Sequence, residues 1–97
     1  MAQVVISDDA KENLDRLFEF LVNDNPQWAI EAVFAIHDGL RILNGHPLVG
    51  RQVGDSPLRE LIISKGRSGY VALYEYDEIA DEAVIMAIRH QRESGYN

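Results

Sequence analysis

Two side chains near the C-terminus, His90 and Tyr96, could take part in acid–base chemistry. An unperturbed imidazole titrates near neutral pH, so His90 could transfer a proton there. A tyrosine could do so only if its pKa lay well below about 10, and for Tyr96 we therefore favour packing or a contact role. A histidine at a strand end more often caps its sheet, which is the favoured interpretation of His90.

These residues follow a short apolar run, residues 83–89, which holds six apolar residues and then a charge. The run is too short for a typical helix, and it lies between Asp81-Glu82 and a polar tail. This pattern predicts a strand buried on both faces. Such a strand lies centrally in its sheet, so residues 90–96 would leave the best-fixed part of the fold.

The spacing of apolar residues predicts the elements that position this strand. Residues 3–6 form a first strand; a helix starts after the capping Ser7 and ends at the break 23–26; a second helix covers about 27–43. A loop (44–57) and strands at 58–64 and 70–76 follow. Along the last of these strands, Tyr70, Ala72, Tyr74 and Tyr76 share one face, and Val71, Leu73 and Glu75 share the other. The order β-α-α-β-β-β implies an α+β fold, a single domain over residues 1–97. Its small, mostly antiparallel sheet is packed by an N-terminal αα-hairpin.

Composition excludes several classes of protein. The chain has no cysteine, so disulfides and thiolate sites are ruled out, and its histidines and carboxylates show no metal-ligand spacing. The N-terminus shows no secretory signal or membrane span, and we expect a cytoplasmic protein without a cofactor. The net charge of −7 disfavours nucleic-acid binding. Residues 41–70 alone are basic, with five bases and two acids.

Four other side chains are candidates for contact with a partner. Arg51, in a glycine-rich loop, either braces backbone carbonyls or binds a partner, while Arg59 either pairs within the strand or faces a partner. Trp28 and Phe34 lie on the second helix. Core packing is the favoured interpretation of these two, and an exposed docking face is the alternative.

In order and spacing, several local motifs resemble the RelE/ParE superfamily of bacterial type II toxins over nearly the whole chain. The motifs are Asn25-Pro26, residues 47–51 (PLVGR), residues 59–61 (REL), residues 70–74 (YVALY) and residues 88–96 (IRHQRESGY). The resemblance implies one of two activities. RelE-like members cut mRNA on the ribosome, whereas ParE-like members act on DNA gyrase, and in both branches an antitoxin holds the toxin inactive.

Cations on the central strands separate the two branches. The resemblance implies that RelE-like ribonucleases use lysines and arginines there, but this chain has Glu60, Ile62 and Val71 at the matching positions. Metal-free RNA cleavage needs a group that takes the 2′-OH proton and cations that stabilise the phosphorane. We therefore favour a ParE-like gyrase inhibitor that is not an enzyme. A metal-independent, ribosome-dependent endoribonuclease is the alternative.

The resemblance also assigns partners and site residues. The expected partners are a ParD-like antitoxin and DNA gyrase, with the ribosome as the alternative target, and we expect no membrane and no sequence-specific nucleic-acid binding by the toxin alone. The expected partner-binding residues are Trp28, Phe34, Arg51, Arg59, Arg89 and Tyr96. If the chain were a ribonuclease, the catalytic candidates would be Arg59, His90, Arg92 and Tyr96.

Overall fold

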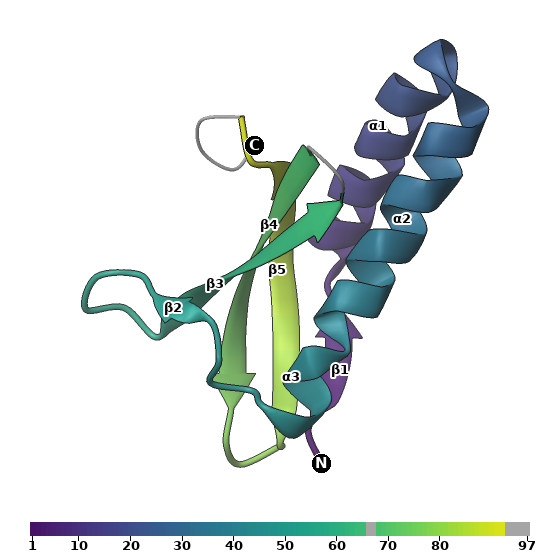
Figure 1. Ribbon diagram of the computed structural model, residues 1–97. Helices are drawn as coiled ribbons and strands as arrows, with labels where there is room; N and C mark the ends of the chain where they lie inside the picture. Colours follow the sequence, from purple (N-terminus) through teal and green to yellow (C-terminus); the bar gives the residue numbers. More distant parts are fainter. Residues whose placement is uncertain (66–67, 93–97) are drawn as a thin grey trace.

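Over residues 1–65 and 68–92, which the computed structural model describes, the chain forms a helical hairpin packed on a five-stranded sheet (Figure 1). The elements in chain order are β1 (Gln3–Ile6), α1 (Asp8–Asp24), α2 (Pro26–Leu40), α3 (Ile42–Gly45), β2 (Arg51–Gln52), β3 (Leu58–Lys65), β4 (Ser68–Asp77) and β5 (Glu82–His90). This arrangement confirms the predicted α+β fold.

The sheet has the strand order β1-β5-β4-β3-β2. Only the β1–β5 pair is parallel; the other pairs are antiparallel. The interior position predicted for β5 is confirmed, but the predicted burial on both faces is wrong. Ala83, Ile85 and Ile88 are buried, whereas Met86, at an irregularity in the β4–β5 register, is 40% exposed. One face of β5 is less buried because the hairpin covers only the other.

The hairpin covers one face of the sheet, with α1 against β5 and α2 against β3. On β4, Tyr70, Ala72 and Tyr74 point to this covered face and belong to the core together with Ile63 of β3. Alternation along the strands places Glu60, Ile62, Val71 and Arg89 on the far face. The sequence predicted this division of the β4 residues correctly.

Local side chains fix the two ends of the hairpin. The Ser7 hydroxyl accepts a hydrogen bond from the Ala10 N–H (3.1 Å) and caps α1. Asn25 caps α2 by accepting from the Gln27 N–H (2.9 Å), and Pro26 occupies the first turn. The two helices are therefore joined through a single residue, and their common end projects past the strands in Figure 1.

Several predicted boundaries differ from the observed ones: the strands predicted at 58–64 and 70–76 extend over Leu58–Lys65 and Ser68–Asp77, and two larger differences concern the second helix and the loop that follows it. The second helix ends at Leu40 instead of continuing to residue 43, because the chain tightens at Arg41, whose N–H bonds to the carbonyl of Asp38 three residues back. The loop 44–57 contains the two-residue strand β2, which pairs with Arg59 and Glu60. A strand this short leaves no periodic signal in the sequence.

Candidate functional site

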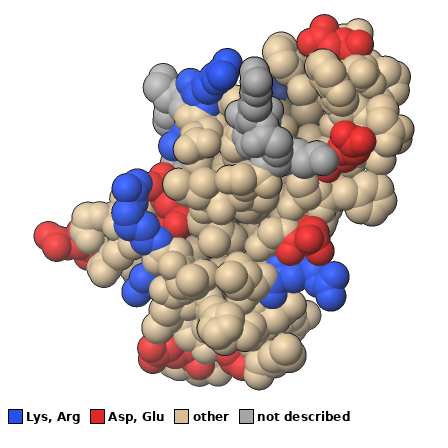
Figure 2. Space-filling model, in the orientation of Figure 1, with Lys and Arg blue, Asp and Glu red and all other residues tan. Residues whose placement is uncertain are grey.

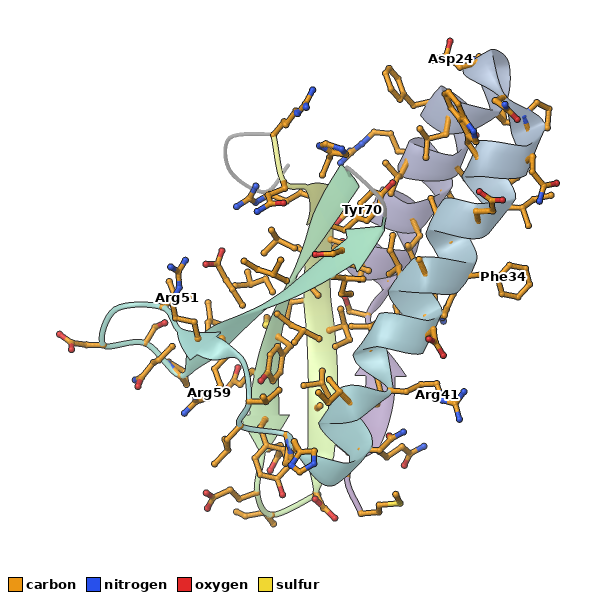
Figure 3. All side chains as sticks on the ribbon, in the orientation of Figure 1. Asp24, Phe34, Arg41, Arg51, Arg59 and Tyr70 are labelled. Atoms are coloured by element: carbon orange, nitrogen blue, oxygen red, sulfur yellow. The ribbon has the colours of Figure 1, made fainter. Side chains whose placement is uncertain are left out.

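The hairpin exposes large apolar side chains. Phe34 is 71% exposed and Trp28 59% exposed, so the core-packing interpretation of both residues is wrong. The inner face of α2 is filled instead by Ala29, Ala32 and Ile36. Figure 3 shows Phe34 pointing away from the sheet.

Phe34 also lines a shallow groove on the hairpin, which we call the outer groove. Its volume is about 240 Å³, and its lining residues come from both helices: Phe18, Ile30, Val33, Phe34 and His37. Apolar surface of this kind, left exposed on a small protein, is typical of a docking face.

Arg59 braces the loop that precedes β2. Its guanidinium donates to the carbonyl oxygens of Leu48 (3.1 Å) and Gly50 (2.8 Å). The N–H of Gly50 in turn donates to the hydroxyl of the buried Tyr74 (2.8 Å). The bracing role that we considered for Arg51 therefore belongs to Arg59, and contact between Arg59 and a partner stays a prediction.

On the far face, Glu60 lies within ion-pairing distance of two arginines. Its carboxylate is 3.0 Å from Arg51 and 4.0 Å from Arg89, measured from guanidinium nitrogen to carboxylate oxygen. The Arg51 side chain is 80% exposed, whereas those of Arg89 and Glu60 are 18% and 16% exposed. Glu60 therefore offsets positive charge on this face.

The far face also brings together Glu60, Ile62 and Val71, the positions at which the resemblance implies strand cations in a ribonuclease. Ile62 lies opposite Val71, and Val71 lies opposite Arg89. Of the three predicted positions, Ile62 and Val71 are thus aliphatic and Glu60 is acidic, while the adjacent Arg89 is a cation. The predicted lack of strand cations holds at Ile62 and Val71 in three dimensions as well as in the sequence.

His90 is held in place by its neighbours at the end of β5. Its ring packs edge-on against Tyr70, with a centroid distance of 5.4 Å, and its Nδ1 accepts from the Arg92 N–H (3.1 Å). Arg89 donates to the carbonyl oxygens of His90 and Gln91 (both 3.2 Å). The sheet-capping role favoured for His90 matches these contacts.

The catalytic candidates do not gather at one point. Arg59 lies opposite Tyr74 and His90 lies opposite Tyr70, which separates them by roughly 13 Å along β4 at the usual strand rise. Arg92 lies two residues beyond His90, and Tyr96 lies outside the described residues. Among the described candidates, Arg59 therefore lies apart from His90 and Arg92.

A second groove, which sequence reasoning missed, lies between α1 and the end of β5. We call it the basic groove; its volume is about 550 Å³. Its residues are Asn13, Arg16, Leu17 and Phe20 from α1, and Ile88, Arg89, His90 and Arg92 from the other side. The α1 residues recur at helical spacing, but only the packing of α1 against β5 shows which partner they face.

Charge elsewhere on the molecule is mostly negative. Figure 2 shows acidic side chains at the projecting end of the hairpin and at the bottom of the molecule, where the turn between β4 and β5 lies. No group of three or more potential metal ligands occurs among the described residues, and none of the helices described there is long and apolar enough to cross a membrane.

Comparison with known proteins defines the class. The fold matches the solved structure of the chromosomal ParDE toxin–antitoxin system from P. aeruginosa with a TM-score of 0.75 at 22% identity, covering 93% of this chain and 96% of that one. It also matches the toxin–antitoxin complex RelBE2 from Mycobacterium tuberculosis, with a TM-score of 0.58 at 23% identity, covering 93% and 98%. These similarities show a shared fold. Curated proteins include no match.

The family follows from the sequence itself. A family model described as the ParE toxin of the type II toxin–antitoxin system parDE matches residues 4–95. The chain belongs to this family and is the toxin component of a type II toxin–antitoxin system. The resemblance proposed from local motifs is thereby confirmed.

Proposed function

We propose that this toxin inhibits DNA gyrase, acts in the cytoplasm and is neutralised by a ParD-like antitoxin. One observation carries the choice of target: the strand positions that would need cations for metal-free RNA cleavage hold Ile62 and Val71, and the neighbouring arginines share Glu60. Because Arg51 and Arg89 share one carboxylate and no lysine or arginine stands at Ile62 or Val71, the far face offers less positive charge to a phosphorane than a full set of strand cations would. Binding to a protein target needs no such centre.

The exposed hairpin supports a function based on protein contacts. Interface hot spots are enriched in aromatic and arginine side chains, and Trp28 and Phe34 are both more than half exposed. We propose that these aromatics dock on gyrase. Arg51, Arg59, Arg89 and Tyr96 remain predicted partner-binding residues.

An antitoxin partner is supported by family membership and by the two similar structures. Those structures are of a ParDE toxin–antitoxin system and a RelBE2 toxin–antitoxin complex. By analogy, we propose that this chain is also held by an antitoxin in the cell.

The alternative, a ribosome-dependent endoribonuclease, has one observation in its favour. His90 and Arg92 lie together at the end of β5, beside a groove lined by further arginines. This arrangement places an imidazole near positive charge. However, Nδ1 of His90 already accepts a backbone hydrogen bond, so in the neutral ring Nε2 carries the proton, and His90 could act as a base only by giving up that hydrogen bond.

The test is a gyrase supercoiling assay with the purified protein. We expect the wild type to inhibit supercoiling or to trap cleaved DNA. Phe34→Ser and Trp28→Ser should each weaken inhibition about ten-fold, a typical loss for an interface aromatic. The control is Ile79→Ser, which changes a fully exposed apolar side chain on the β4–β5 turn.

Cleavage of mRNA in stalled ribosomes is measured with the same preparations. No effect on gyrase at concentrations that arrest growth, together with cleavage that His90→Ala abolishes, would replace the gyrase proposal with the ribonuclease alternative. Ile79→Ser separates loss of a docking face from a general effect of removing exposed apolar surface.

A further inference from the structure

The edge of β5 changes its partner halfway along the strand. β1 pairs with β5 only as far as Ile6 opposite Ile85. Beyond that point, side chains at the start of α1 take over: the Ser7 hydroxyl donates to the carbonyl of Met86 (3.3 Å), and the buried Asn13 accepts from the N–H of Ile88 (2.9 Å). Because α1 satisfies these backbone groups, an added strand has no place there.

The space that remains along this edge is the basic groove, and side chains form its walls. Leu17, Phe20 and Ile88 give it an apolar lining, and its volume of about 550 Å³ lies in the range of ligand sites. Phe20 is 69% exposed, so one wall is open to an incoming group. The groove can therefore bury a large apolar side chain.

The charge of the groove is opposite to that of the whole chain. Arg16, Arg92 and His90 line it together with Arg89, which also lies 4.0 Å from Glu60, and none of its described lining residues is acidic, although the chain carries a net charge of −7. Cations concentrated around a low-dielectric cleft attract negative groups. The groove is thus suited to a carboxylate that lies next to an apolar side chain.

The surroundings of the groove favour a short acidic segment over a nucleic acid. Helix α1, which forms one wall, carries six carboxylates and two cations in its sequence. A polyanion that extended past the groove would be repelled by these carboxylates. A peptide with one or two acidic residues in the groove would not be.

We propose that the basic groove binds an acidic segment of the antitoxin. A large apolar side chain of that segment packs between Leu17 and Phe20 while its carboxylates pair with Arg16 and Arg92. This inference rests on the proposed antitoxin partner, and it specifies which kinds of antitoxin side chain bind in the groove.

The test measures the affinity of the purified toxin for its full-length cognate antitoxin. Arg16→Glu and Arg92→Glu should each raise Kd at least ten-fold, and the difference from wild type should shrink as salt is increased. Arg41→Glu makes the same change of charge at an exposed arginine paired with Asp38, outside the groove. It should change Kd by less than two-fold.

Charge reversal on the partner makes the test specific. Replacing acidic residues of the antitoxin with arginine, one at a time, should yield a variant that restores binding to Arg16→Glu or Arg92→Glu. Equal affinity of all three toxin variants, or no restoring antitoxin variant, would overturn the proposal. So would competition by a ten-nucleotide oligouridylate that Arg16→Glu and Arg92→Glu abolish, because the groove would then bind nucleic acid.

Growth arrest and gyrase inhibition, measured with the same variants, separate this inference from the proposed function. If Arg16→Glu binds antitoxin like wild type while gyrase is inhibited, the groove proposal fails and the function stands. If gyrase is unaffected while groove substitutions still weaken antitoxin binding, the gyrase proposal fails and the groove stands. Circular dichroism on each variant checks the fold.

Discussion

The two faces of the sheet differ most clearly at two neighbouring isoleucines of β3. Ile63 points to the covered face and is 6% exposed, while Ile62 points to the far face and is 55% exposed. On the covered face, Ile63 packs so closely on α2 that a Cβ at Gly39 would lie 2.8 Å from it. On the far face, Ile62 belongs to the same surface as the ion pairs of Glu60. The covered face therefore holds most of the core, while the far face combines the buried Val71 with exposed side chains such as Ile62.

The sharpest test of this comparison is the same substitution at both isoleucines. Ile63→Ala should lower the free energy of unfolding by about 2–5 kcal/mol, the usual cost of emptying a core position. Ile62→Ala should cost about 1 kcal/mol or less, mostly lost strand propensity. Both values come from denaturant unfolding monitored by circular dichroism.

Both changes replace an isoleucine of β3 with alanine. The difference between the two losses of stability therefore measures the effect of burial alone. Equal losses at the two positions would mean that Ile62 is covered in solution, by a second copy of the chain or by another part of it. Repeating the measurement across protein concentrations distinguishes these cases, since only association makes stability depend on concentration.

The sequence was sufficient to predict the structure wherever the local spacing of residues decides it. Alternation along residues 70–76 assigned Tyr70, Ala72 and Tyr74 to one face, and Asn25-Pro26 marked the start of α2. Periodicity shows which residues share a face, but it does not show what covers that face. For this reason burial was wrongly predicted on both faces of β5, and Trp28 and Phe34 were assigned to the core.

The candidate site was harder to predict because its contacts join distant parts of the chain. The Arg51–Glu60 pair depends on the register between β2 and β3, and β2 has only two residues. Arg16 reaches the basic groove only because α1 packs along the edge of β5. Neither relation is encoded in local spacing, whereas the missing cations at Ile62 and Val71 could be recognised from the sequence.

Two buried tyrosines on the covered face should also make the fold less stable at alkaline pH. Burial raises the pKa of Tyr74, outweighing the lowering effects of the Gly50 N–H and Arg59, and burial alone raises the pKa of Tyr70. A raised folded-state pKa gives stability that is complete below the unfolded value of about 10 and is lost as pH rises above it. Stability should then fall by up to about 1.4 kcal/mol per pH unit for each such tyrosine.

The measurement is the unfolding free energy from pH 8 to 11.5, for wild type and Tyr74→Phe. The variant should be less stable near neutral pH, because the Gly50 N–H loses its buried acceptor, at a cost of about 1–3 kcal/mol. Its decline above pH 10 should be shallower, since phenylalanine has no proton to lose. An unchanged alkaline slope would show that Tyr74 does not carry the effect.

The smallest expected effect belongs to the far face, in the pair between Arg51 and Glu60. A double-mutant cycle with Arg51→Ala and Glu60→Gln should give a coupling of about 0.2–1 kcal/mol, because the Arg51 side chain is 80% exposed. The coupling should decrease in 1 M salt. Glu60→Gln alone should lower the free energy of unfolding more than Arg51→Ala, because Arg89, only 18% exposed, also loses its carboxylate.

A coupling above about 2 kcal/mol that salt leaves unchanged would contradict the comparison between the two faces. It would make the far face a second stabilising layer rather than a surface available to partners.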